Sequence, residues 1–131
     1  MPAWSTFEEI EAWQMARDLC SDIFRIIQYQ GLDHDYGLKD QINRSSGSIM
    51  DNIAEGFGRG GNREFVGFLS IARASCAEVR SQLHRIHDRQ YITDEEYQHL
   101  LDKTQQISQK ISALIVYLRK SPYTGPKFKK P

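Results

Sequence analysis

The chain has 131 residues and a mass of 15.2 kDa, enough for one domain with one hydrophobic core and too short for the usual two-domain enzyme. Seventeen Lys and Arg balance seventeen Asp and Glu, and 40% of the residues are apolar, as in soluble globular proteins. The charge is unevenly distributed, because residues 1–118 carry 12 basic and 17 acidic residues, whereas residues 119–131 carry five basic residues and no acid. The composition therefore excludes a uniformly basic nucleic-acid surface and allows a local one.

The two cysteines, Cys20 and Cys76, are too few for a disulfide framework and form no CxxC pair, so we expect small, reduced core residues. Residues 1–11 contain three Glu, no basic residue and no apolar run, which is unlike a secretory signal. No stretch approaches the roughly 18 consecutive apolar residues of a membrane helix. We therefore expect a cytoplasmic protein without a membrane partner.

Apolar residues recur every three or four positions, and the alternation typical of half-buried strands never persists, which predicts an all-α fold. The first apolar stripe, from Phe7 to Ile27, follows Ser5-Thr6, with Glu8 and Glu9 three residues on, a doubled capping box. We expect this helix to end near residues 28–31. Several apolar residues lie off the stripe and indicate a second contact surface, such as a subunit interface: Trp4, Met15, Leu19, Phe24 and Ile26.

Two further stripes occupy the middle of the chain. The second runs from Leu38 to Phe57 and stops in a cluster of glycines. The third begins after Asn62, a favourable N-cap, and continues to Ile86 with the 4-3 spacing of a heptad seam. Both patterns predict long amphipathic helices.

The fourth stripe begins with the capping box Thr93 to Glu96 and ends at Ser121-Pro122, because proline disfavours helix at the residue before it. Each predicted helix spans about 20 to 28 residues, or roughly 30 to 40 Å. Four helices of similar length with short connections predict an antiparallel up-down-up-down four-helix bundle. We place this bundle at residues 1–120 and a basic, flexible tail at residues 121–131.

The glycine cluster formally contains the GxGxxG pattern of dinucleotide-binding sites at Gly56, Gly58 and Gly61. Such a site needs a strand before the glycines, whereas the preceding residues are predicted to be helical, so we prefer a helix end followed by a turn. The alternative is an anion site in which Arg59, Arg63 and the free N–H groups of the third helix hold a phosphate.

The histidines invite a metal-binding interpretation. His84 and His87 are spaced i, i+3, and Glu96 and His99 form one Glu-x-x-His motif on the next predicted helix. Di-iron bundles need two such motifs and further inward carboxylates, so we favour solvent-facing histidines and predict no metal site and no cofactor. No nucleophile elbow, HExxH or P-loop occurs, and we predict no enzymatic activity.

Polar stripes run beside the apolar stripes of the second and third predicted helices. Their members are Gln41, Ser45, Ser48, Asn52 and Glu55 on the second helix and Ser75, Glu78, Gln82 and Arg85 on the third. Antiparallel packing predicts the following neighbours: Gln41 and Arg44 beside Ser75 and Glu78, and Glu55 beside Arg63. The stripes then form either a solvated face or a hydrogen-bonded seam, within one bundle or between subunits.

The segment from Gln41 to Arg59, with its specific Ser-Ile-x-x-Asn-Ile-Ala-Glu-Gly core, resembles the signature of the bacterial four-helix-bundle proteins also called 23S ribosomal RNA intervening-sequence proteins. The similarity continues from Arg63-Glu64-Phe65 to Glu78 and includes Trp13-Gln14-Met15-Ala16. The resemblance implies a cytosolic four-helix bundle, commonly a homopentamer, without established enzymatic activity. It implies structural roles for a polar set: Gln41, Arg44, Ser48, Asn52, Glu55, Ser75 and Glu78.

The family is also similar in fold to the accessory protein of diversity-generating retroelements, a basic pentamer that binds nucleic acid and a reverse transcriptase. Since the body of this chain is acidic, we expect any contact with RNA, DNA or a nucleic-acid enzyme to be local. The candidate contacts, with two aromatic rings that could stack on bases, are Arg59, Arg63, Arg119, Lys120, Tyr123, Lys127, Phe128, Lys129 and Lys130. The leading hypothesis is a non-catalytic homo-oligomeric scaffold for nucleic acid or protein. The alternatives are a structural oligomer without a ligand, with a merely solubilising tail, and a metal- or phosphate-dependent enzyme.

Overall fold

The computed structural model describes residues 4–121, which contain four α-helices, two short 3-10 helices and no strand. The helices are η1 (Phe7–Glu9), α1 (Glu11–Ile26), η2 (Leu32–His34), α2 (Tyr36–Gly58), α3 (Asn62–Asp88) and α4 (Asp94–Lys120). The predicted all-α fold with four helices is therefore confirmed. No helix in this part of the chain combines the length and apolar character needed to cross a bilayer.

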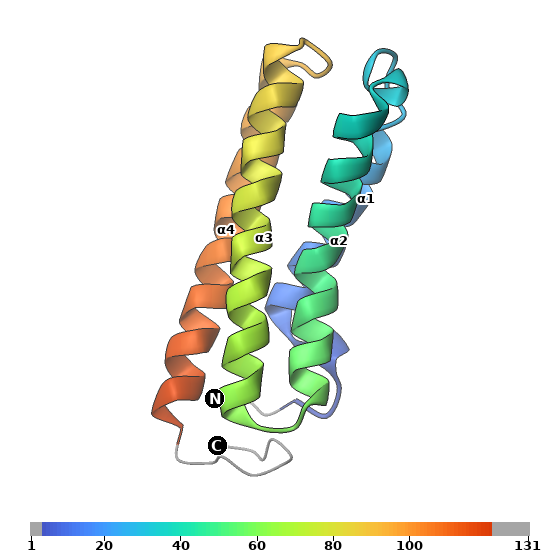
Figure 1. Cartoon of the computed structure of the whole chain (residues 1–131). Coiled ribbons are helices and arrows are strands. Elements are labelled where there is room, and N and C mark those ends of the chain that lie inside the picture. The colour runs from blue at the N-terminus through green and yellow to red at the C-terminus, as the bar shows by residue number, and fades with distance from the viewer. Residues whose placement is uncertain (1–3, 122–131) are drawn as a thin grey trace.

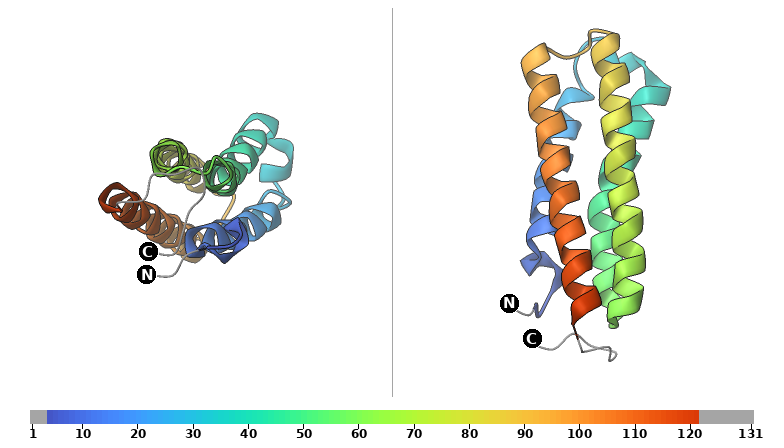
Figure 2. Two further views of the ribbon diagram at one scale, coloured as in Figure 1. Left: turned by 90° about the horizontal axis from the view of Figure 1, so that it is seen from below. Right: turned by 90° about the vertical axis from the view of Figure 1, so that its left-hand side faces the viewer.

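The four α-helices lie side by side (Figures 1 and 2). Each contacts the next in sequence, and α1 also contacts α4, so that the four surround one core. The α1–α2 and α3–α4 connections lie at one end of the molecule, whereas the α2–α3 turn lies at the other end, beside η1 and the last turn of α4 (Figure 1). We call the second end, formed by residues 58–63, η1 and residues 117–121, the turn end.

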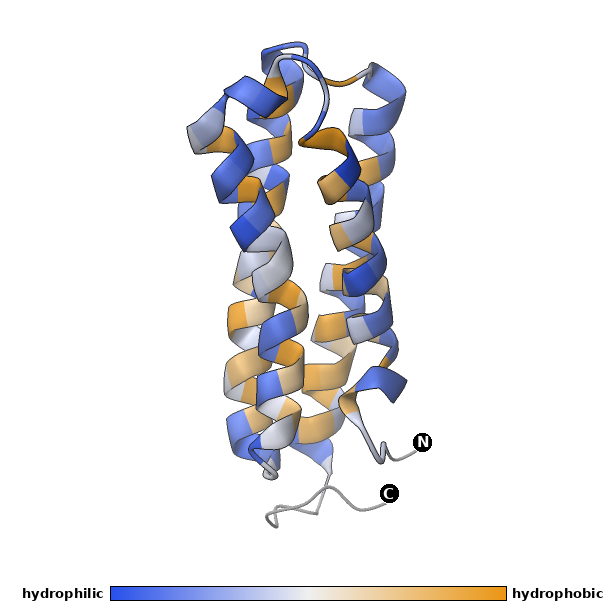
Figure 3. Ribbon diagram, turned by 90° about the vertical axis from the view of Figure 1, so that its right-hand side faces the viewer, coloured by the Kyte–Doolittle hydropathy of each residue, from blue (hydrophilic) through white to orange (hydrophobic). Residues whose placement is uncertain are grey.

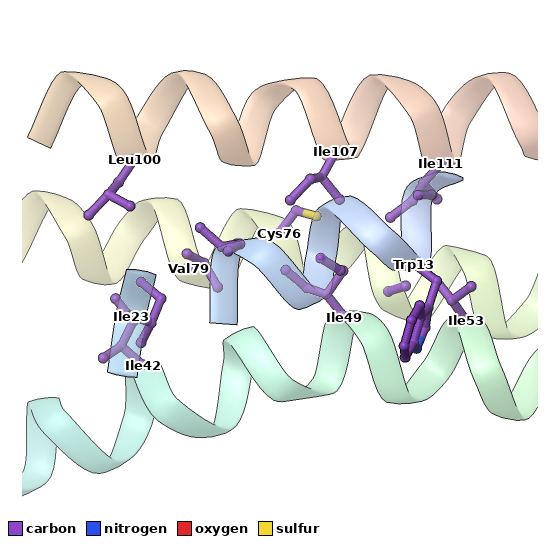
Figure 4. Packing of buried hydrophobic residues seen from close by; sticks show 14 of the residues in the cluster. Trp13, Ile23, Ile42, Ile49, Ile53, Cys76, Val79, Leu100, Ile107 and Ile111 are labelled. Carbon is purple, nitrogen blue, oxygen red and sulfur yellow. The ribbon is translucent and has the colours of Figure 1, made fainter. Parts of the chain in front are cut away.

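One apolar stripe from each helix builds the core, as the three- and four-residue spacing predicts. The labelled side chains in Figure 4 come from all four helices and point into the space between them: Trp13, Ile23, Ile42, Ile49, Ile53, Cys76, Val79, Leu100, Ile107 and Ile111. Apolar positions recur along every helix between hydrophilic ones (Figure 3). Cys76 is 1% exposed, and burial raises the pKa of its thiol to about 12. Cys20 is only half-buried, and both thiols are free.

α1 is shorter than the sequence predicts. The η1 segment makes only a 3-10 turn, and Ile10 has an extended backbone, so α1 begins at Glu11 and contains 16 residues. The break turns Ile10 into the core, where it is 2% exposed, and sets the ring of Phe7 edge-on to Trp13, 5.2 Å between centroids. This apolar packing prevails over the predicted capping box, since Thr6 makes no side-chain cap hydrogen bond.

The apolar residues predicted to lie off the first stripe are mostly part of the core. Leu19 and Ile26 are fully buried, and Trp4 and Met15 pack against core residues. Of the five, Phe24 alone is largely in solvent, with 63% of its surface exposed. The predicted surplus of apolar surface on the first helix is therefore wrong apart from Phe24. The reason is that α1 packs on both α2 and α4, which buries a wide arc of its surface.

Two polar side chains fix the starts of α3 and α4 in different ways. The predicted capping box of α4 is confirmed, because Thr93 Oγ1 accepts from the Glu96 N–H (3.1 Å) and Glu96 Oε1 accepts from the Thr93 N–H (3.0 Å). The predicted N-cap role of Asn62 is wrong, because Gly61 occupies the cap position of α3. The buried Asn62 Nδ2 instead donates to the Leu118 carbonyl oxygen (3.1 Å), which ties the start of α3 to the end of α4.

Candidate functional site

The two polar stripes meet where α2 packs on α3. Three hydrogen bonds join them within the chain: Ser45 Oγ to Gln82 Oε1 (2.5 Å), Ser75 Oγ to Ser48 Oγ (2.9 Å) and Arg85 Nη2 to Gln41 Oε1 (2.5 Å). Ser45, Ser75 and Gln82 are buried. Within residues 4–121, every fully buried side-chain nitrogen and oxygen atom has a hydrogen-bond partner. A satisfied hydrogen-bonded seam thus lies inside the bundle, between α2 and α3.

Individual partners in the seam differ from those predicted. The structure pairs Gln41 with Arg85 (2.5 Å), Arg44 with Asp40 (3.1 Å), Asn52 with Ser48 (2.8 Å) and Glu55 with Arg59 (2.8 Å). The last three pairs join residues four apart on α2 or, for Arg59, at its C-cap. Gln41 contacts Arg85 of α3, which lies farther from the turn than the predicted neighbours Ser75 and Glu78. Helical side chains tilt toward the N-terminus of their own helix, which on α3 is toward the turn. The Cα atom of an α3 residue that contacts α2 therefore lies farther from the turn than the contact itself.

Gly56, the last residue of the Ser-Ile-x-x-Asn-Ile-Ala-Glu-Gly segment, lets α2 and α3 approach closely. A Cβ atom on Gly56 would lie 2.6 Å from Phe68 Cβ and 2.9 Å from Phe65 Cδ1. Gly60, with a φ of 89°, then forms the left-handed position of the turn. The glycines therefore end a helix and reverse the chain, as preferred from the sequence. The element directly before the turn is α2, whereas a dinucleotide site requires a strand there.

Arg59 is already engaged at the turn end. Its guanidinium pairs with Glu55 (2.8 Å) and lies over the ring of Phe68, 5.1 Å from the centroid. Both contacts hold the side chain along the α2–α3 surface. Arg59 is about half exposed, but its charge is partly balanced by Glu55, so it contributes less positive potential than an unpaired arginine.

Two other predicted contact residues share one pocket at the turn end. The pocket lies between the first turn of α3 and the last turn of α4, and Arg63 and Arg119 line it together with Asn62, Val66, Leu118 and Ser121. Arg63, Arg119 and the adjacent Lys120 are exposed. The Asn62–Leu118 hydrogen bond joins the two walls. The remaining predicted contacts, Tyr123, Lys127, Phe128, Lys129 and Lys130, lie outside the described residues.

The histidines at the opposite end are held by neighbours other than a metal. The His84 ring accepts or donates at Nδ1 with the Tyr97 hydroxyl (2.6 Å), and His87 Nε2 meets Asp94 (2.6 Å). The His87 ring also stacks on Tyr97, 3.8 Å between centroids. His84 and His99 are exposed, whereas His87 is half-buried. In the described part of the chain, no three His, Cys, Asp or Glu side chains are grouped so that they could hold a metal.

Some long-range polar contacts have no counterpart in the sequence prediction. Lys103 of α4 is half-buried between Asp18 (2.5 Å) and Asp22 of α1. Burial alone would raise the pKa of Asp22, but Lys103 and Arg25 outweigh it and hold that pKa below its ordinary value. Asp18 and Asp22 lie four residues apart beside an apolar stripe, and this spacing is the one sequence signal that could have indicated a site for a basic side chain.

A second unpredicted contact joins the connections at the end opposite the turn end. The Tyr29 hydroxyl donates to Glu96 Oε2 (2.5 Å), on the same carboxylate that caps α4. Burial alone would raise the pKa of Glu96, whereas hydrogen bonds from Thr93 and Tyr29 lower it below its ordinary value. These contacts stabilise the fold and leave the turn end as the candidate binding surface.

Comparison with known proteins identifies relatives that match most of the chain. The sequence model of the family described as 23S rRNA-intervening sequence protein matches residues 8–113. A solved structure from Bacteroides thetaiotaomicron VPI-5482, of a protein with unknown function from the S23 ribosomal protein family, has a TM-score of 0.73 and 22% identity. The similarity covers 79% of this chain and 97% of that chain, and at this identity it shows the fold alone. A search of curated proteins gave no match.

Proposed function

Because the chain belongs to the 23S rRNA-intervening sequence protein family, we propose that it is a non-catalytic, homo-oligomeric scaffold in the cytoplasm that binds nucleic-acid phosphates at its turn end. The four helices would form an antiparallel up-down-up-down bundle. The oligomer would be the homopentamer that the family resemblance implies. The basic residues of 122–131 would extend the same surface.

The pocket shared by Arg63 and Arg119 carries this proposal. Two guanidinium groups in one pocket suit a phosphodiester, because each can donate two hydrogen bonds to phosphate oxygens. The start of α3 adds N–H groups that no side chain caps. These are contacts to the backbone of a nucleic acid, so they provide affinity without sequence selectivity.

The charge distribution favours a contact at one end rather than along the bundle. Residues 1–118 carry an excess of five acidic residues, which disfavours a polyanion along the helices. In a cyclic oligomer, symmetry would place every turn end on the same face of the ring. Several weak phosphate sites would then act on one strand, so that a few arginines per subunit give useful avidity.

Fluorescence anisotropy with labelled single-stranded RNA and DNA across a salt series tests the proposal. We expect R63Q and R119Q each to weaken binding by about three- to ten-fold and to reduce the salt slope by about one per subunit. R80Q is the matched control, since Arg80 is an exposed arginine of α3 away from the turn end. Salt-independent binding, or equal losses in all three variants, would contradict a local phosphate site.

Light scattering coupled to size-exclusion chromatography tests the assembly separately. We expect a homo-oligomer at micromolar concentration, and a monomer would contradict this part of the proposal. An oligomer that binds neither RNA nor DNA would support the alternative of a structural assembly without a ligand. Exposed apolar side chains on three helices offer candidate subunit contacts: Phe24 (63% exposed), Ile71 (50%) and Val116 (49%).

A further inference from the structure

An open groove separates the N-terminal segment and α1 from the last turns of α4. Its apolar floor includes Trp4, Ala113 and Leu114, and its rim carries Glu9, Glu11 and Lys110. The two walls, blue and orange-red in the right view of Figure 2, run beside each other down to the turn end. The groove exists because the break at Ile10 ends the regular helix and sends Trp4 across to α4, where its ring lies edge-on to Tyr117, 6.2 Å between centroids.

The rim of the groove has an excess of acidic groups. Lys110 Nζ pairs with Glu11 Oε1 (2.7 Å), which neutralises one carboxylate. Glu9 lies on the same rim and Glu8 precedes it, and both side chains are exposed. Two glutamates and one lysine therefore line the groove beside its apolar floor, and a third glutamate, Glu8, precedes them in the chain. Such a surface suits a segment that carries several cations and an aromatic ring.

We propose that residues 122–131 of the same chain occupy this groove, with Phe128 against the apolar floor and Lys127, Lys129 and Lys130 near the glutamates. The segment has the required chemistry, because it contains three lysines, two aromatic residues and no acid. It follows the helix that forms one wall of the groove, since α4 ends at Lys120.

The chain length permits this contact. Residues 110–114 lie roughly 9 to 15 Å back from the end of α4, at 1.5 Å per residue. A ten-residue segment reaches up to about 33 Å when extended. Because the segment is tethered, its effective concentration at the groove is in the millimolar range. Ion pairs with the glutamates and burial of the Phe128 ring therefore need to supply only a millimolar affinity.

The groove is a different pocket from that of Arg63 and Arg119, so the contact can be tested apart from phosphate binding there. It has one consequence for the proposed function. Lysines held by the glutamates are withheld from phosphates, so a polyanion that uses residues 122–131 must first displace them.

Zero-length carbodiimide cross-linking of the full-length protein, followed by mass spectrometry, tests the contact. The reagent joins carboxylates to lysine amines that touch, and the Glu11–Lys110 pair at 2.7 Å is an internal positive control. We expect cross-links from Lys127, Lys129 or Lys130 to Glu8, Glu9 or Glu11. In a mixture of ¹⁴N- and ¹⁵N-labelled protein, these cross-links should join peptides of the same isotope.

Fluorine NMR of protein labelled with 5-fluorotryptophan provides a second readout. The variant K127Q/K129Q/K130Q should shift the signal of Trp4, in the groove, and leave that of the buried Trp13 in place. K39Q on α2 is the control for a lost surface charge. An unshifted Trp4 signal overturns the proposal. The proposal is also overturned if the Glu11–Lys110 control cross-link forms but none of the three lysines is cross-linked to a glutamate of the groove. The same holds if the three lysines are cross-linked to carboxylates over the whole surface. Cross-links of mixed isotope would show a segment from a second copy in the groove and also overturn it.

Discussion

Replacing Gly56 with alanine should destabilise the protein, although alanine is the better helix former. In an open helical position, alanine stabilises by about 1 kcal/mol relative to glycine. At Gly56, however, the new Cβ would lie 2.6 Å from Phe68 Cβ and 2.9 Å from Phe65 Cδ1. The Cβ of Phe68 cannot rotate away, so α2 and α3 must move apart, and overpacking of this kind costs roughly 1 to 3 kcal/mol. We expect a net loss of about 1 to 2 kcal/mol, or about 3 to 10 °C in Tm.

Thermal and urea unfolding followed by circular dichroism, at one protein concentration, measures the effect. G47A is the matched control, because Gly47 lies in the same helix and a Cβ there would meet nothing within 4 Å. We expect G47A to raise the free energy of unfolding by about 0.5 to 1 kcal/mol, opposite in sign to G56A. If G56A were as stable as the wild type, or gained as much as G47A, the close approach of α2 and α3 would be refuted.

Three further predictions concern individual polar groups. N62A should lose about 1 to 2 kcal/mol in urea unfolding, because it leaves a carbonyl of α4 without its buried donor; an unchanged midpoint would contradict this role. T93A should cost about 1 kcal/mol by the same assay through loss of the α4 cap, and T93S should restore most of it. Burial alone would raise the pKa of Asp22, but Lys103 and Arg25 outweigh it and hold this pKa below its ordinary value. Its stabilising contribution is therefore present above the ordinary aspartate pKa and lost as the pH falls through the folded-state pKa, so D22N should flatten the acid limb of a stability–pH curve. An acid limb as steep as in the wild type would exclude this contribution.

Much of the fold follows from local sequence signals. The apolar stripes place the core side chains of all four helices, and the Thr93–Glu96 box marks the start of α4, because these signals act within a few residues. The Ser5-Thr6 box fails for a different reason. Its helix would have kept Ile10 in a regular α-helical conformation, and the structure instead buries Ile10 through an extended backbone. Tertiary packing thus overrides a cap worth about 1 kcal/mol.

The candidate site depends on contacts that single-sequence patterns do not encode. Asn62 reads as a helix cap, yet its amide reaches a carbonyl 56 residues away. Arg63 and Arg119 are equally distant in sequence, and only the packing of α3 on α4 brings both into one pocket. The sequence therefore predicts that arginines are available at the turn and at the end of the fourth helix. It does not predict that they act together.

The polar signature and the candidate binding residues have separable roles in this structure. Ser48 and Ser75 join α2 to α3 by a hydrogen bond within the chain. Gly56 allows the two helices to approach closely because it has no side chain. Changes at these positions should therefore reduce stability first and affect binding only through unfolding. Arg63 and Arg119 are exposed and contribute no hydrogen bond to the seam. Their loss should therefore reduce phosphate binding while the free energy of unfolding stays within about 0.5 kcal/mol of the wild type. In this chain the polar set specifies how α2 and α3 pair, and the binding that we propose is at the turn end, where Arg63 and Arg119 are exposed.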